Sequence, residues 1–97
     1  IKWGPLHPAI LGLTTKVTDD VYFIQLNRGL TLEQTQRVLM HELIHVYQFH
    51  YNLLNDLPAG AVLWKGEIYY WSMPWSERPW EIHAEAWSDK LFVPTRP

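Results

Sequence analysis

A helical pattern surrounds the stretch VLMHELIHVY at residues 38–47, and it constrains the fold more than any other part of the chain. Apolar residues recur at helical intervals from Leu32 onward, and Thr31 stands where a helix N-cap belongs. We therefore expect one long helix from about residue 32 to about residue 51. His41 and His45, four residues apart, then point from the same face of that helix.

Patterns on either side of this helix predict strands. Residues 21–27, VYFIQLN, are rich in β-branched and aromatic residues and roughly alternate, which is typical of a strand. Residues 62–71, VLWKGEIYYW, indicate two short strands around Lys65-Gly66, or one strand with a bulge. Residues 1–16 carry two prolines and two glycines without a sustained period, so we expect a loop or an arm there.

A second helix is expected near the C-terminus. Pro79 stands at a typical first helical position, and Trp80, Ala84 and Trp87 fall on one helical stripe. The helix should stop before Val93-Pro94, because the residue ahead of a proline disfavours the helical conformation.

These elements fit a single α+β domain over residues 1–97, because a chain of 97 residues leaves little room for a second domain. We expect a short antiparallel or mixed sheet packed on the histidine-bearing helix, with the second helix carrying glutamates beside it. Both helices are then available to one site.

Composition and charge exclude several kinds of protein. The chain has no cysteine, so any metal must be held by histidine and carboxylate rather than by thiolate. The formal net charge is −2 and no run of basic residues appears, so we expect no nucleic-acid partner. No apolar run approaches the roughly eighteen residues of a membrane helix, so we expect a soluble protein without a membrane partner. The chain begins with Ile1 rather than methionine, and we treat it as a fragment or a processed product.

The spacing of His41, Glu42 and His45 matches the chemistry of a zinc ion. Residues four apart on a helix are separated by about 40° of rotation and about 6 Å of rise, so both imidazoles can bind one tetrahedral ion. Glu42 is rotated by about 100° from His41, which places its carboxylate beside the ion. There it can act as general base on a zinc-bound water, whose pKa the metal lowers towards about 7.

A zinc site of this kind needs a third ligand, and the segment PWEIHAEAWSDK offers more than one. With Glu81 as the ligand, Glu85 follows one turn later and can accept the second N–H of a zinc-bound histidine. With Glu85 as the ligand, Asp89 follows at the same interval. His83 is a third alternative, although it lies about 200° around the helix from Glu81. Helical geometry alone does not choose among them.

Two segments carry a resemblance to a known family. HELIHVYQ at residues 41–48 follows the pattern HELxHVxQ, and RPWEIHA at 78–84 follows RPWExxA. Over roughly residues 21–94 the chain resembles gluzincin-type zinc metallopeptidases of the minimal kind often carried by bacteriophages. The second segment is also similar to ImmA/IrrE-type metallopeptidases, and CAAX-protease-like gluzincins place an acid four residues after their glutamate, as Glu85 stands to Glu81.

The resemblance implies a zincin-like fold with one Zn²⁺ bound by His41, His45 and Glu81, and with Glu85 behind them. A thermolysin-like pattern matches Glu85 and the residues after it, so Glu85 stays the reserve ligand. His83, where such phage sequences more often show glutamate, stays the second reserve.

Zinc peptidases commonly bind their substrate as an added strand, so the resemblance also implies that residues 21–26 form or adjoin the edge of the sheet. A donor for the developing oxyanion is required as well. The candidates are Tyr69, Tyr70, Arg78 and His83.

Two hypotheses for function follow. The first is a zinc-dependent endopeptidase acting on a polypeptide, and the second is a noncatalytic domain that keeps the metal for binding or assembly. Glu42 favours the enzyme, because a structural zinc site needs no base. The sequence leaves the oligomeric state open, and it leaves the location open between the cytoplasm and a phage particle.

Overall fold

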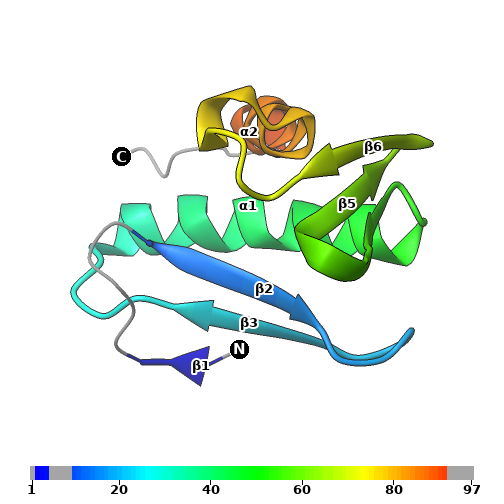
Figure 1. Ribbon diagram of the computed structural model, residues 1–97. Coiled ribbons are helices and arrows are strands. Elements are labelled where there is room, and N and C mark those ends of the chain that lie inside the picture. Colours follow the sequence, from blue (N-terminus) through cyan, green and yellow to red (C-terminus); the bar gives the residue numbers. More distant parts are fainter. Residues whose placement is uncertain (1, 5–9, 92–97) are drawn as a thin grey trace.

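The computed structural model of the chain describes residues 2–4 and 10–91, and its fold is α+β. Within that part, two helices lie against two three-stranded sheets (Figure 1). The strands are β1 (Lys2–Trp3), β2 (Gly12–Lys16), β3 (Tyr22–Leu26), β4 (Leu54–Asp56), β5 (Ala61–Trp64) and β6 (Glu67–Tyr70). The helices are α1 (Leu32–His50) and α2 (Pro79–Leu91), with short 3-10 turns η1 (Pro58–Gly60) and η2 (Trp75–Glu77).

The first sheet is mixed and lies against one side of α1. Its strand order is β1-β3-β2, with β1 parallel and β2 antiparallel to the central strand β3. Ile24 and Leu26 of β3 are buried beneath α1, while Phe23 on the other face is exposed and Gln25 between them is half-buried. This alternation is the pattern of a strand with one buried face.

The register of this sheet decides which backbone groups of β2 face away from β3. The Asn27 N–H donates to the Leu11 carbonyl, and the Val17 N–H donates to the Val21 carbonyl, each at 2.9 Å. Hydrogen-bonded positions alternate along an antiparallel pair. The even-numbered residues of β2 therefore direct their backbone N–H and C=O groups to the edge of the sheet.

Helix α1 begins where its capping signals predict. Thr31 Oγ1 accepts a hydrogen bond from the Gln34 N–H at 3.1 Å, and Gln34 Oε1 accepts one from the Thr31 N–H at 2.9 Å. Such a capping box satisfies two backbone donors at once. The buried residues of the helix are His41, Glu42, His45, Gln48 and Phe49. Four of these five are polar, so this face is not an ordinary apolar core.

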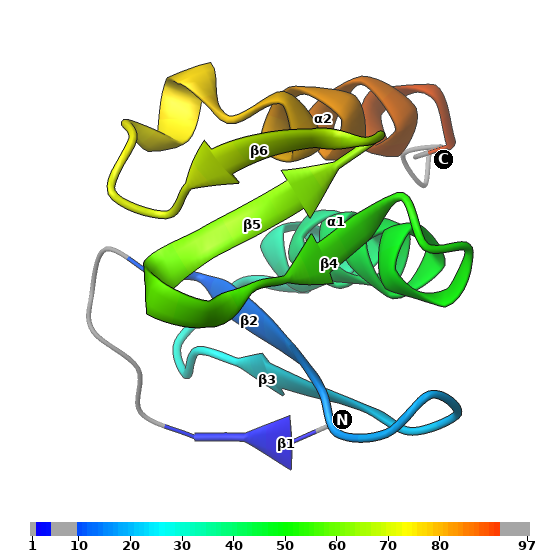
Figure 2. The same cartoon turned by 45° about the vertical axis from the view of Figure 1, so that its right-hand side comes forward.

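The second sheet is antiparallel and has the order β4-β5-β6. The predicted pair of short strands is confirmed: β5 and β6 are joined at Lys65-Gly66, whose φ angles of 48° and 84° fit a two-residue hairpin. Figure 2 shows β4 beside β5, in front of the C-terminal half of α1.

Helix α2 lies on the opposite side of α1 from the first sheet (Figure 1). The main core lies where the C-terminal end of α1, the second sheet and the start of α2 meet. Its buried residues are Phe49, Leu54, Val62, Trp64 and Trp80. Neither helix in the described ranges is long and apolar enough to cross a membrane.

The expected loop or arm at residues 1–16 is wrong for two stretches. Residues 2–3 form β1 and residues 12–16 form β2, because both pair with β3 and the pairing supplies what the local sequence does not. Residues 5–9 of that segment lie outside the described residues, as does Pro94 beyond α2. Strand β4 was not predicted, because residues 52–61 were expected only to end the long helix.

Candidate metal centre

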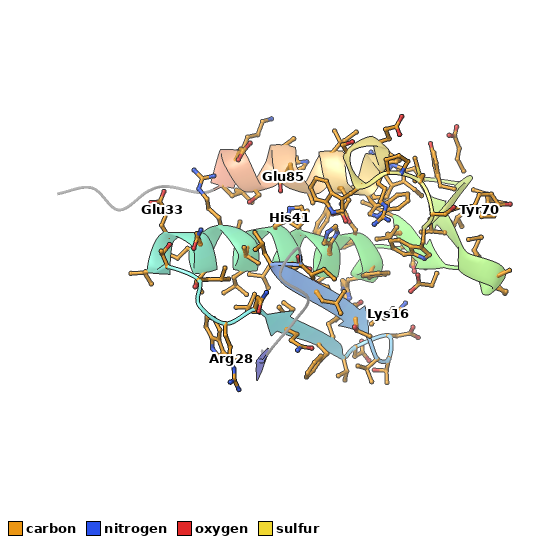
Figure 3. The ribbon with its side chains drawn as sticks, turned by 60° about the vertical axis from the view of Figure 1, so that its left-hand side comes forward. Lys16, Arg28, Glu33, His41, Tyr70 and Glu85 are labelled. Carbon is orange, nitrogen blue, oxygen red and sulfur yellow. The ribbon has the colours of Figure 1, made fainter. Side chains whose placement is uncertain are left out.

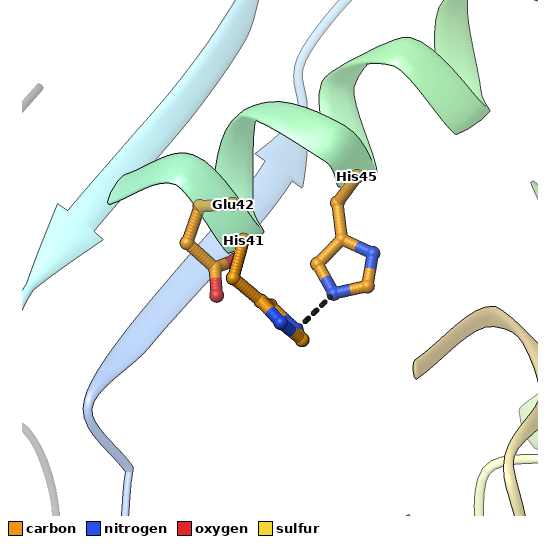
Figure 4. A group of neighbouring side chains, drawn as sticks. All are labelled: His41, Glu42 and His45. Carbon is orange, nitrogen blue, oxygen red and sulfur yellow. Dashed lines mark hydrogen bonds between the residues drawn. The ribbon is translucent and has the colours of Figure 1, made fainter. Parts of the chain in front are cut away.

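Three side-chain atoms from two helices meet at one point. His41 and His45 project from α1, and Glu81 projects from the first turn of α2, 40 residues after His41 in the sequence. The two Nε2 atoms lie 3.0 Å apart, and Glu81 Oε1 lies 2.9 Å from His41 Nε2 and 2.7 Å from His45 Nε2. Figure 4 shows the two imidazoles turned toward each other.

These three atoms fit a bound cation. An unprotonated imidazole nitrogen and a carboxylate oxygen both present lone pairs, so their close approach needs a proton or a metal ion between them. Two imidazoles and one carboxylate form the protein ligand set of a catalytic zinc site, which keeps its fourth position open. Bonds of about 2.0–2.2 Å place tetrahedral ligand atoms about 3.3–3.6 Å apart. The observed edges of 2.7–3.0 Å are shorter than these separations by about 0.3–0.9 Å, so the three side chains must move slightly apart to hold an ion.

The pKa shifts of Glu81 and His45 have their cause in this contact. Burial by itself raises the pKa of the Glu81 carboxyl, but hydrogen bonds from His41 and His45 and their charges lower it to about 2. Burial by itself lowers the pKa of His45, but the Glu81 carboxylate and the Gln48 acceptor raise that pKa above its ordinary value. In the metal-free chain the ionised form of Glu81 and the protonated form of His45 therefore stabilise each other.

Glu42 lies beside the triangle, on the side of β2 (Figure 4). Its Oε1 accepts a hydrogen bond of 2.5 Å from the Thr14 hydroxyl. His41, Glu42 and His45 each offer a ligand atom, and these atoms lie within 4.8 Å of one another. The Glu42 carboxylate is thus held close to both imidazoles.

Gly12 permits the close approach of β2 to this carboxylate. A Cβ atom at Gly12 would lie 2.6 Å from Val38 Cγ1 and 3.1 Å from Glu42 Cγ. Val38 is β-branched and cannot rotate away freely. A residue without a side chain is therefore needed where β2 passes α1.

Glu85 lies against the far nitrogen of His41. Its Oε1 is 2.8 Å from His41 Nδ1, and Figure 3 shows Glu85 above His41 on α2. The imidazole N–H is not aimed at the oxygen, because His41 Nδ1 is buried without a hydrogen bond. The Glu85 side chain is 54% exposed, whereas that of His41 is 11% exposed. The role of Glu85 as an outer partner of His41 stays a prediction.

A groove of about 600 Å³ opens onto these residues. Gly12 and Thr14 of β2 line one side of it, and α2 with the segment around η2 lines the other. Trp75 of η2 stacks on the His41 ring with a centroid separation of 6.0 Å and an interplanar angle of 21°. The groove therefore runs past His41, His45 and Glu81 between an edge strand and the Trp75 ring.

The four candidate oxyanion donors lie in different places. Of the four, only Arg78 lines the groove, and it donates to the backbone carbonyls of Trp71 at 2.6 Å and Met73 at 3.1 Å. The other three, which do not line it, are Tyr69, Tyr70 and His83.

Each of these three side chains makes contacts elsewhere or lies far from the groove. The Tyr69 hydroxyl donates to Glu67, Tyr70 lies far from His41 at the tip of the molecule (Figure 3), and His83 Nδ1 contacts Gln48. The oxyanion role stays a prediction for Arg78.

Sequence reasoning missed several residues of the site. Gly12 and Thr14 lay in the segment expected to be a loop, so nothing indicated that they would approach Glu42. Gln48 stands three residues after His45, a spacing that allows contact on a helix, but no role was assigned to it. Trp75 reaches His41 only through the fold of the segment between β6 and α2.

Comparison with known proteins finds no relative of the chain. No protein-family model, no curated protein and no solved structure matches the chain.

Proposed function

We propose that this chain is a zinc-dependent peptide-bond hydrolase with a zincin-like fold of the gluzincin kind. The observation that carries the proposal is the meeting of His41 Nε2, His45 Nε2 and Glu81 Oε1 within 2.7–3.0 Å of one another, with Glu42 beside them. Two imidazoles, one carboxylate and one adjacent carboxylate base are what metal-assisted hydrolysis needs.

The chain's own residues divide the work of the reaction. His41, His45 and Glu81 would hold a zinc ion, which supplies Lewis acidity and lowers the pKa of a water molecule towards about 7. Glu42 would serve as the general base that accepts a proton from the attacking water, and as the acid that returns it to the leaving amine. The Thr14 hydroxyl keeps the Glu42 carboxylate in one orientation while it does so.

A polypeptide is the substrate that the groove favours. β3 is the central strand of the first sheet, so the edge beside the site is β2, which adjoins the expected residues 21–26. The outward backbone groups of β2 border the groove and can pair with an extended peptide. Such pairing would hold a scissile amide alongside Glu42 through main-chain hydrogen bonds alone, whatever the side chains of the peptide.

The alternative is a noncatalytic domain that binds zinc for assembly. A structural zinc site is closed by four protein ligands and has no use for a buried carboxylate next to the ion. Glu42 is only 6% exposed and is held by Thr14, an arrangement that disfavours this alternative.

Two measurements on the purified chain test the proposal. Metal analysis after dialysis should find one zinc ion per chain. Incubation with a broad peptide library should then show cleavage by the wild type and none by Glu42→Gln, which removes the base but keeps all three metal ligands. The matched control is Glu33→Gln, an exposed position on the same helix, which should cleave like the wild type.

The outcomes separate the two hypotheses. Zinc binding with cleavage that depends on Glu42 supports the hydrolase. Zinc binding without cleavage of any peptide supports the noncatalytic alternative. A chain that retains no zinc contradicts both.

A further inference from the structure

Gln48 is the most deeply buried polar residue of α1, with none of its surface exposed. Its side-chain amide makes three contacts that join the two halves of the site. Gln48 Oε1 lies 2.7 Å from His45 Nδ1, and Gln48 Nε2 lies 2.9 Å from the Trp80 carbonyl oxygen and 2.8 Å from His83 Nδ1. One side chain of α1 therefore touches both a metal-binding histidine and the helix that carries Glu81.

The orientation of the Gln48 amide follows from these partners. A backbone carbonyl can only accept a hydrogen bond, so the atom facing Trp80 must be the NH₂ group. The opposite atom is then the amide oxygen, which can only accept. His45 must therefore donate to it, with its proton on Nδ1.

The proton on Nδ1 decides what the rest of the His45 ring can do. A neutral imidazole carries one proton, so a proton fixed on Nδ1 leaves the lone pair on Nε2. His45 Nε2 is the atom that faces His41 and Glu81. The Gln48 contact thus selects the form of His45 that can bind a metal ion through Nε2.

The second hydrogen of the Gln48 NH₂ group links Gln48 to His83 on α2. His83 Nδ1 must accept that hydrogen, so His83 carries its own proton on Nε2 when neutral. Its ring lies between Trp64 and Trp87, with centroid separations of 5.3 Å and 6.3 Å. These contacts give His83 the place of a support for Gln48, away from the groove.

We propose that Gln48 is the positioning residue of the zinc site: its oxygen fixes the Nδ1 proton of His45, and its NH₂ group holds α2 where Glu81 completes the ligand set. The expected effect of Gln48 on zinc binding rests on the proposed function. The statement about the His45 proton holds for the metal-free chain as well.

Two variants separate the functions of the two ends of the amide. Gln48→Met has a similar length but neither accepts nor donates strongly. Gln48→Glu keeps an acceptor for His45 and loses both donors to α2. Gln36→Met, an exposed position on the same helix, is the matched control.

The first measurement is made without metal, at a pH where His45 is neutral. Nitrogen chemical shifts of the histidine rings report which nitrogen carries the proton. We expect the proton on Nδ1 of His45 in the wild type, Gln48→Glu and Gln36→Met, and its loss from Nδ1 in Gln48→Met. An unchanged Nδ1 proton in folded Gln48→Met overturns the proposal, whatever the chain does with zinc.

The second measurement is the zinc dissociation constant, taken by competition with a chelator. Loss of an outer hydrogen-bond partner typically weakens metal binding by about 10–100-fold, and we expect a loss of that size for Gln48→Met. Gln48→Glu should recover only part of the affinity and should melt at a lower temperature, because the bond from the Gln48 NH₂ group to the Trp80 carbonyl is gone. Equal affinity in wild type and folded Gln48→Met overturns the proposal.

The design stays decisive if a variant fails. If Gln48→Met does not fold, the wild type decides: a neutral His45 ring with its proton on Nδ1 supports the role of Gln48, and a proton on Nε2 instead contradicts it. If the wild type binds no zinc, the proposed function fails, while the nitrogen shifts still decide the role of Gln48.

Discussion

Glu81 and Glu85 stand one helical turn apart on α2, yet they touch opposite nitrogens of His41. Glu81 reaches Nε2 and also His45, whereas the half-exposed Glu85 lies against Nδ1. Their substitution by glutamine should therefore have unequal effects. We expect Glu85→Gln to weaken zinc binding about tenfold, as for an outer partner, and Glu81→Gln to lose zinc on dialysis.

Metal analysis of the two variants, side by side with the wild type, checks this order. Zinc lost from Glu85→Gln but kept by Glu81→Gln would make Glu85 the ligand and reverse the assignment. Both variants keep the size of the side chain, so circular dichroism should show the same helix content in all three chains.

The charges of Glu81 and His45 predict how the stability of the metal-free chain depends on pH. The pKa of Glu81 is lowered to about 2 from 4.5, so its contribution is present above pH 4.5 and is lost as the pH falls towards 2. The pKa of His45 is raised above 6.5, so its contribution is present below pH 6.5 and is lost as the pH rises through the raised value. The pair therefore stabilises the fold most between pH 4.5 and 6.5.

Thermal unfolding with a chelator, from pH 5.5 upward, tests this prediction. In the wild type the thermal midpoint should fall as the pH rises above 6.5 and passes through the raised pKa of His45. Glu81→Gln should lack most of that fall, since His45 then has no carboxylate partner. A midpoint that stays level or rises in the wild type would show that the carboxylate and imidazolium do not stabilise the fold.

Strand β2 is the element whose placement depends most on one residue. Any side chain at Gly12 meets Val38 and Glu42, so Gly12→Ala must push β2 away from α1. Overpacking of this kind typically costs about 1–3 kcal/mol, and we expect that loss in the free energy of unfolding. Peptide cleavage should fall as well, because Thr14 moves with the strand.

Gly4→Ala is the matched control for this substitution. A Cβ at Gly4 meets only the end of the flexible Gln25 side chain, at 3.1 Å. Chemical denaturation should therefore show a smaller loss than at Gly12. Equal stability of Gly12→Ala and the wild type would mean that β2 does not press on α1.

The elements differ in how well the sequence predicts them, for a physical reason. Helix α1 carries its own signals, namely a capping box at Thr31 and an apolar period, and its extent was predicted to within one residue. Strands β2 and β4 are short and lack such signals, because they exist through pairing with strands elsewhere in the chain. Local sequence therefore could not place Gly12 or Thr14.

The residues of the candidate site also differ in how well the sequence predicts them. The spacing of His41, Glu42 and His45 is local to one helix, so the sequence alone placed these residues together. The third position was ambiguous, because Glu81 and Glu85 share a face of α2 and only its packing on α1 decides which of them reaches both histidines. The role of Gln48 also depends on contacts with that second helix.

For the molecule as a whole, zinc would act as a bridge between α1 and α2. A ligand that binds only the folded chain stabilises it by about 2.7 kcal/mol at one hundred times its dissociation constant. We expect zinc to raise the thermal midpoint and to slow amide hydrogen exchange in α2. The gain should grow with pH, because zinc competes with the proton on His45.

Glu81→Gln is the variant that tests this bridge, and Glu33→Gln is its control. In Glu81→Gln, zinc should leave exchange in α2 unchanged, since α2 no longer contributes a ligand. Zinc that protects α1 but not α2 in the wild type would contradict a site shared by the two helices.

The forty residues between His41 and Glu81 also bear on the order of events during folding. The histidine pair belongs to one helix and can form early, whereas Glu81 arrives only after the intervening hairpin has closed and α2 has docked. An ion held weakly by the two histidines would then meet its third ligand last. Refolding in the presence of zinc should thus accelerate the docking of α2, with the metal acting as a template for the final step.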